Sequence, residues 1–227
     1  MKRSKIEFTQ KTFLEKIVIN SVCSDDSFSK IEAPWFRDLI TYCTREDKSL
    51  TIPTRKVLAN EIENLFNNRK EALKKELNST PGAISFVIDG WTSSNQKPFL
   101  GIVARWISDD WVLKTMVIDM KLLEGPHTGK NLASAFSETL DDFGLWDKLL
   151  LAITADNAGN MDTFFTELSA IASSKGLTFD PANRKIRCLA HIMNLSCQDI
   201  IQEAKRSLIS TVDSSKFSFV ISFNIFD

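Results

Sequence analysis

Two aspartates follow short apolar segments that have the pattern of buried strands. Asp89 ends the segment Ala83–Asp89, and Asp156 ends the segment Leu149–Asp156. Sites in open sheets gather outside the carboxyl ends of the strands, where carboxylate oxygens suit a hard cation such as Mg²⁺. If the two strands are neighbours, both carboxylates reach one metal site and metal-assisted phosphodiester chemistry becomes possible. The alternative is that each aspartate only caps the loop or helix that follows it.

Cys188 and His191 have the spacing of half a zinc site. A structural zinc needs four ligands, and His127 is the only other histidine of the sequence. No structural zinc is therefore expected. His191 is then either a core histidine or a hydrogen-bonding group that faces a phosphate, and the spacing leaves both open.

Two further kinds of site are not supported. Residues Gly125–Lys130 (GPHTGK) open a predicted helix, but they lack the GxxxxGK[ST] spacing of a nucleotide-binding P-loop. The Cys/His, Ser/His and GxSxG arrangements of covalent hydrolases are also missing.

Composition and charge exclude several classes of protein. The 227 residues are 43% hydrophobic and 25% charged with a net charge of −1, as in an ordinary globular protein. The sequence contains neither a membrane-length apolar run nor a secretory signal, so a membrane or secreted protein is not expected. Four cysteines in a chain of this length do not form a disulfide framework, which predicts a reducing, intracellular setting. They are Cys23, Cys43, Cys188 and Cys197.

The net charge is unevenly distributed. Residues 83–181 hold 7 basic and 13 acidic side chains, a net charge of −6, whereas residues 1–82 carry +3 and residues 182–227 carry +2. An acidic middle segment repels phosphate unless a bound divalent metal neutralises it. The plainer interpretation is an acidic face in contact with solvent.

The elements that must position these residues form an α/β pattern. Three strands are followed by a helix, a strand, a helix, a strand and a helix. The expected strands are Ala83–Asp89, Phe99–Ile107, Trp111–Leu123, Leu149–Asp156 and Ile186–Cys188. The expected helices are Thr128–Phe143, Asn157–Ser173 and Leu189–Arg206. The turn residues at 108–110 predict an antiparallel hairpin. The order predicts a mixed sheet, with three antiparallel strands and then β-α units, flanked by helices on both faces.

A helical module precedes this core and an unusual segment follows it. Residues 5–80 have helical periodicity, and Pro34 and Pro53 each fit the first turn of a helix. The predicted domains are a helical DNA-binding or interaction module at 1–80, a core at 81–206 and an atypical tail at 207–227. Leu208–Asp227 is apolar, serine-rich and strand-like.

Several motifs together resemble the catalytic core of hAT-superfamily DNA transposases, the hobo/Activator group. They are Asp89–Ser93 (DGWTS), His127–Gly129 (HTG), Thr154–Met161 (TADNAGNM), and Arg187–Leu195 (RCLAHIMNL) with Asp199. The resemblance spans roughly residues 80–206 with the motifs in the family's order. Residues 5–80 are similar to the helical segment that precedes this core.

The resemblance implies an RNase H-like fold and a nuclear protein that binds DNA at transposon ends. Asp89 and Asp156 would be the first two members of an Asp-Asp-Glu triad that holds Mg²⁺ or Mn²⁺ for strand cleavage and transfer. Trp91 matches the family's aromatic residue that stacks on a displaced base. Cys188 and His191 match its C-x-x-H element, whose histidine approaches the DNA, and Asn194 lies in the same motif.

The sequence also departs from the family pattern. The matching ends near Arg206, before the point where the family has a helical insertion, the catalytic glutamate and a dimerisation region. Glu203 follows the histidine motif too closely to take the glutamate's place, and the BED zinc finger is missing. We therefore expect a truncated transposase-like protein that is inactive alone, binds divalent metal weakly and exposes apolar surface.

Two other interpretations stay open. One is a non-enzymatic regulatory protein whose helical module pairs with a full-length hAT transposase, or with a second copy of this chain. A gene-model fragment without a function of its own is the remaining alternative.

Overall fold

The computed structural model describes residues 9–44, 49–148, 152–156 and 159–211. Contacts within the chain divide it into two compact units, Met1–Glu76 and Leu77–Asp227. No helix in the described ranges is long and apolar enough to cross a membrane.

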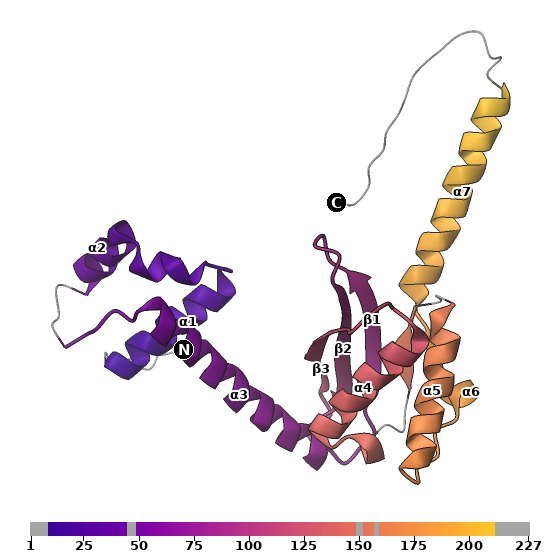
Figure 1. The fold of residues 1–227 in the computed structure, drawn as a ribbon, viewed down its shortest axis with the longest axis horizontal. Coiled ribbons are helices and arrows are strands. Elements are labelled where there is room, and N and C mark those ends of the chain that lie inside the picture. Colours follow the sequence, from indigo (N-terminus) through magenta and orange to yellow (C-terminus); the bar gives the residue numbers. More distant parts are fainter. Residues whose placement is uncertain (1–8, 45–48, 149–151, 157–158, 212–227) are drawn as a thin grey trace. The chain divides into compact units, whose positions relative to one another are not determined.

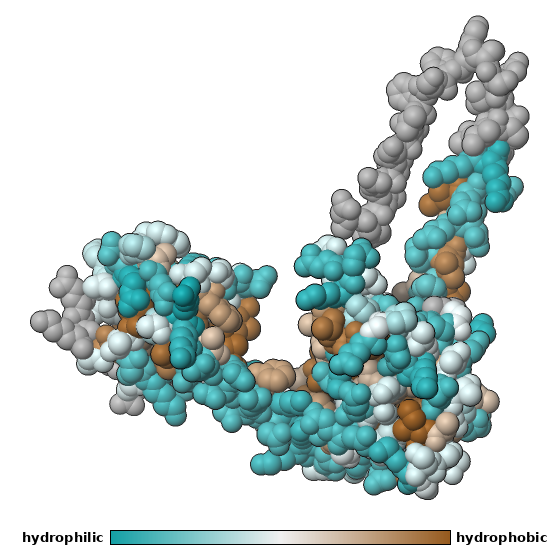
Figure 2. Space-filling view, viewed as in Figure 1, coloured by the Kyte–Doolittle hydropathy of each residue, from teal (hydrophilic) through white to brown (hydrophobic). Residues whose placement is uncertain are grey.

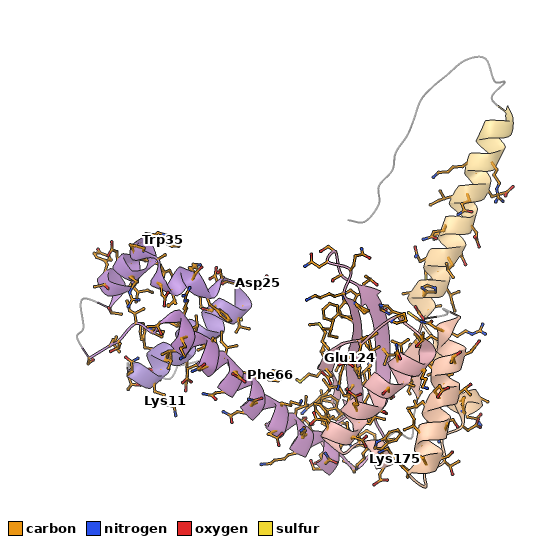
Figure 3. The ribbon with its side chains drawn as sticks, viewed as in Figure 1. Lys11, Asp25, Trp35, Phe66, Glu124 and Lys175 are labelled. Atoms are coloured by element: carbon orange, nitrogen blue, oxygen red, sulfur yellow. The ribbon has the colours of Figure 1, made fainter. Side chains whose placement is uncertain are left out.

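The first unit is helical. It contains α1 (Gln10–Cys23), the 3-10 helix η1 (Phe28–Glu32), α2 (Pro34–Cys43) and most of α3 (Arg55–Ser79). Its core is a small apolar cluster, and the outer side of α2 keeps Trp35 exposed (Figure 3). The cluster consists of Ile17, Val18, Ile31 and Leu58, with Phe13, Leu14, Phe36, Ile52, Ile62 and Leu65 packed against it.

The two prolines of this unit differ in position. Pro34 is the first residue of α2, as predicted. The prediction that Pro53 lies in the first turn of the next helix is wrong, because α3 begins two residues later, at Arg55. Thr54 precedes that helix, and its hydroxyl accepts a hydrogen bond from the Val57 amide.

The second unit is built on a five-stranded mixed sheet with the strand order β3-β2-β1-β4-β5. The pairs β1–β2 and β2–β3 are antiparallel, whereas β1–β4 and β4–β5 are parallel. The predicted mixed sheet with three antiparallel strands is thereby confirmed. The strands are β1 (Ser85–Thr92), β2 (Pro98–Ile107), β3 (Leu113–Leu122), β4 (Ile153–Ala155) and β5 (Lys185–Arg187).

Two long helices, α4 (Gly129–Phe143) and α5 (Asn160–Ser174), lie side by side against one face of this sheet (Figure 1). The contact is aromatic: Phe86 of β1 meets Phe136 of α4 at 5.4 Å between ring centroids, and Phe136 meets Phe164 of α5 at 5.8 Å. All three rings are fully buried, so they fix the sheet against both helices. The prediction of helices on both faces is wrong for the described residues, because the opposite face keeps Val117 and Leu122 exposed.

The ends of α4 follow the sequence signals. The Thr128 hydroxyl accepts a hydrogen bond from the Asn131 amide at 3.2 Å, and Gly144 ends the helix with a φ of +66°. Only glycine adopts this left-handed conformation without steric cost, so Gly144 acts as a terminator as predicted.

The remaining elements are short, except for the last helix. They are η2 (Trp146–Lys148), α6 (Pro181–Arg184) and α7 (Leu189–Thr211). Apolar side chains are exposed along α7 (Figure 2), among them Leu189, Met193 and Ile200.

The prediction of a strand-like segment from Leu208 onward is wrong for its first four residues. Helix α7 continues through Thr211, because no proline or glycine interrupts it after Leu189. The rest of that segment, residues 212–227, lies outside the described residues, as do residues 149–151 of the predicted fourth strand and 157–158 of the helix predicted after it.

Gly129 allows α4 and α5 to approach closely at their first turns. A Cβ atom placed on Gly129 would lie 2.4 Å from both the Asn160 carbonyl oxygen and the Phe164 amide nitrogen. These are backbone atoms, which cannot turn aside, so the two helices would have to separate. Gly129, the second glycine of the GPHTGK segment, therefore has a packing role.

We expect Gly129→Ala to lower the free energy of unfolding by about 1–3 kcal/mol or more, because the added methyl group overpacks a backbone contact. Chemical denaturation followed by circular dichroism measures this change. Gly159→Ala is the control, since nothing lies within 4 Å of its Cβ position and its φ is −63°. Equal losses for the two variants would contradict the packing role.

An ion pair links β5 to α5. The Lys185 ammonium group lies 2.5 Å from the Asp162 carboxylate. This hydrogen bond, and then the positive charges of Lys185 and Arg187, lower the pKa of Asp162 below its ordinary value of 3.8. The stabilisation is therefore present above the ordinary pKa and is lost as the pH falls through the lowered folded-state pKa.

We expect Asp162→Asn to lower the melting temperature slightly at neutral pH, because exposed ion pairs contribute little. The difference from wild type should shrink as the pH falls below the ordinary value of 3.8. It should disappear once the pH is below the lowered folded-state pKa, because the carboxyl group is then protonated in both states. Thermal unfolding between about pH 2.5 and 7 measures it, with Glu167→Gln on the same helix as the control. A difference that persists at the lowest pH would show that the pair is not its cause.

Candidate functional site

The pairing of β1 with β4 brings the two predicted metal ligands to the same edge of the sheet. Phe86 is in register with Ile153, and Val87 with Thr154. Two residues further along this register, Asp89 comes beside Asp156, one residue past the end of β4. Neighbouring strands lie about 4.8 Å apart, so the two residues can share one cation.

Both aspartates are reachable from solvent. Asp89 is exposed and Asp156 is partly buried. Two carboxylates are hard oxygen donors, which fit Mg²⁺ or Mn²⁺ with water or phosphate oxygens as the remaining ligands. Within the described residues, no group of three or more His, Cys, Asp or Glu side chains could hold a metal ion.

Strand β5 brings Cys188, the first residue of the C-x-x-H element, next to Asp156. Arg187 pairs with Ala155, and the amide of Cys188 donates a hydrogen bond to the Ala155 carbonyl at 2.8 Å. Helix α7 starts directly afterwards, so the partly buried His191 lies in its first turn. Asn194 lies one turn further on and is exposed.

Trp91 lies flat on the sheet beside Asp89. Its ring stacks on Phe99, its partner on β2, with centroids 5.6 Å apart and an interplanar angle of 20°. It also covers Gly101, whose Cβ position is 3.1 Å from the indole ring. Gly101 is the residue opposite Asp89, and its missing side chain leaves room for the indole. With 39% of its surface exposed, Trp91 offers one ring face to a ligand.

His127 lies next to the candidate site, although the sequence analysis gave it no role beyond its place in the HTG motif. Its Nε2 atom lies 3.2 Å from the Thr92 hydroxyl, and its Nδ1 atom lies 3.3 Å from the Cβ position of Gly90. Its carbonyl accepts a hydrogen bond from the Asn160 side chain at 2.7 Å. His127 thus ties the end of β1 to the first turns of α4 and α5.

The HTG motif holds His127 and the TADNAGNM motif holds Asn160, so the sequence contained a signal for this contact. Sequence spacing, however, does not show that residues 92, 127 and 160 meet. The ring of His127 lies on the helix side of β1, since Gly90 alternates with Asp89 along the strand.

Comparisons with known proteins concern the core that carries these residues. Residues 87–181 match the family model of the ZBED1 RNase-like domain. The chain is 29% identical to the zinc finger BED domain-containing protein RICESLEEPER 1 of Oryza sativa over 69% of its length and 22% of the relative's. It is 26% identical to a Zea mays protein named for the AC transposase, over 85% of this chain and 24% of that protein.

A Talaromyces stipitatus protein, named for a role as a transcriptional regulator (tpeD), is 28% identical over 87% of this chain and 23% of its own length. The chain thus spans about a quarter of the length of these curated relatives. The matched domain and the strand order also confirm the RNase H-like fold that the motifs implied. The core is therefore RNase-like, and the chain is similar to BED zinc finger proteins and to the AC transposase.

Proposed function

We propose that this chain binds a divalent cation through Asp89 and Asp156 and holds DNA at the same sheet edge. The observation that carries the proposal is the parallel pairing of β1 with β4, whose register brings the two carboxylates together. A bound Mg²⁺ ion would supply charge neutralisation and polarise a phosphate oxygen.

The other residues of the edge have roles in binding DNA. Trp91 supports an unpaired base by stacking, because its ring is held against Phe99 and one face is free. His191 and Asn194, in the first turns of α7, donate hydrogen bonds to the DNA backbone, and Cys188 fixes the start of that helix through its carbonyl. A bound metal ion is needed for DNA to approach this edge, since residues 83–181 carry a net charge of −6 that repels phosphate.

Two carboxylates are enough for binding but not for efficient strand cleavage by this chain alone. The resemblance implies a third acid, and the described residues provide no third ligand at this site. We therefore assign to these 227 residues metal and DNA binding in the nucleus, without efficient cleavage or transfer.

A second candidate function is a regulatory one, in which the helical unit pairs with a full-length hAT transposase. The exposed stripe on α2 favours it: Trp35, Leu39 and Tyr42 are 61%, 53% and 83% exposed. These residues lie at i, i+4 and i+7, on one side of the helix. Co-purification with a complete transposase that is lost in a Trp35→Ser/Tyr42→Ser variant would support this function.

We expect Asp89→Asn and Asp156→Asn each to weaken Mn²⁺ binding at least tenfold, because each removes one anionic ligand without changing side-chain size. Isothermal titration calorimetry of the full chain measures this. Asp109→Asn is the control, since Asp109 is an exposed acid in the turn between β2 and β3, at the other end of the sheet. If all four isotherms coincide, the metal site does not exist.

We expect Trp91→Ala to weaken binding of a DNA duplex with an unpaired terminal base roughly 5- to 150-fold, the effect of losing one stacked base. Binding of a fully paired duplex should change little. Fluorescence anisotropy with Ca²⁺ in place of Mg²⁺ measures both. Trp111→Ala is the matched control, because Trp111 is 87% exposed in the β2–β3 turn. Equal effects on the two DNAs would argue against base stacking.

A further inference from the structure

The sheet face opposite α4 and α5 has no cover within the described residues. We call it the open face. Its centre is a row of three cross-strand valines, Val87, Val103 and Val117, which are direct partners on β1, β2 and β3. The row continues through Thr154 of β4 to Ile186 of β5.

The open face is apolar and accessible. Five of its residues are at least half exposed: Ile107, Leu113, Val117, Met120 and Leu122, at 50%, 57%, 63%, 61% and 54%. A groove of about 360 Å³ crosses it, lined among others by Val87, Arg105, Leu113 and Ile186. Single exposed apolar residues are common, but a contiguous patch of this kind marks an interaction surface.

Charges of opposite sign flank the valine row at equal distances. On one side is the row of Ser85, Arg105 and Thr115, with an exposed guanidinium group. On the other side is the row of Asp89, Gly101 and Met120, next to Asp156. On β1 and β2 each charged row lies two residues from the valines, about 6.6 Å along the strands. On β3 a bulge at Ile118 places Met120 three residues after Val117 while keeping it opposite Gly101.

We infer that a second copy of this chain covers the open face, packed sheet against sheet about a two-fold axis along the valine row. Such an axis reverses the strand direction between the copies. The Arg105 row of one copy then lies over the Asp89 row of its partner, and the reverse contact follows by symmetry. The valine rows meet at the centre, as the inner faces of a β-sandwich do.

The charge pattern is what identifies a second copy as the partner. A face with a positive row, an apolar row and a negative row, equally spaced, is complementary to itself under this rotation. Arg105 is exposed and takes part in none of the ion pairs found among the described residues, and the rotation supplies carboxylates to it.

The area of the face sets the expected affinity. Three strands of 8 to 10 residues, widened by the short β4 and β5, give a footprint of roughly 500–600 Å² per copy. Two copies then bury roughly 1,000–1,200 Å², at the lower end of specific interfaces. We therefore expect a dimer with a dissociation constant in the micromolar range.

The inference does not rest on the proposed metal and DNA site, although both use Asp89. Measurements of self-association are therefore made in EDTA, without DNA, and the metal titration is made at a protein concentration at which the chain is monomeric. Under these conditions, a failure to dimerise and a failure to bind metal are distinguishable.

Sedimentation velocity of the full chain between about 2 and 200 µM gives the first test. Wild type should shift from monomer to dimer, and Val117→Lys should weaken dimerisation at least tenfold by burying a charge in the interface. The matched control is Met116→Lys, because Met116 is 49% exposed on the same strand but faces the other way. It should change the dissociation constant less than threefold. A monomer at all concentrations, or equal effects of the two variants, would overturn the inference.

Charge reversal tests the orientation of the copies. Arg105→Asp and Asp89→Arg each place like charges opposite one another, so each should weaken the dimer at least tenfold. The double variant restores opposite charges and should bring the dissociation constant back to within about threefold of wild type. Circular dichroism confirms that each variant is folded, which is expected since both side chains are exposed. Additive losses in the double variant would exclude this two-fold arrangement.

Discussion

The parallel pairing of β1 with β4 is the constraint on which the rest of this core depends. It joins a strand from the antiparallel half of the sheet to the first strand of the β-α half. Its register determines that Asp89 and Asp156 come together, because a shift of one residue would turn one carboxylate to the other face. The paired backbone is short, so the aromatic contacts of Phe86, Phe136 and Phe164 are needed to hold it in place.

The same edge is supported from behind by two close contacts. Gly129 lets the first turns of α4 and α5 meet at backbone distance, and His127 links those turns to Thr92 and Gly90 at the end of β1. Both residues belong to the HTG motif, so this motif is explained by packing as much as by chemistry. A metal site needs ligands held within fractions of an ångström, and these contacts provide that rigidity.

Much of this fold could be predicted because local signals agreed with tertiary packing. The apolar segment before Asp89, the hairpin turn and the Thr128 and Gly144 caps of α4 each specify their element without distant partners. The sequence left open whether β1 and β4 are neighbours, and their parallel pairing is seen only in the structure. The contact of His127 with Thr92 and the ring of Trp91 over Gly101 could not be predicted, because residues far apart in sequence meet there. Pro53 misled because proline fits both a first helical turn and the residues just before a cap.

The open face and the acidic edge share one surface, and this links their functions. Asp89 alternates with Val87 along β1, so its carboxylate is directed to the side where the valine row lies. A cation held by Asp89 and Asp156 would remove the negative charge that a partner's Arg105 requires, and a docked partner would cover Trp91. In the functions proposed above, metal and DNA binding would therefore compete with self-association for the same carboxylates. Loading of the edge with metal and DNA would thus favour the monomer, whereas the free chain would protect its apolar face by pairing.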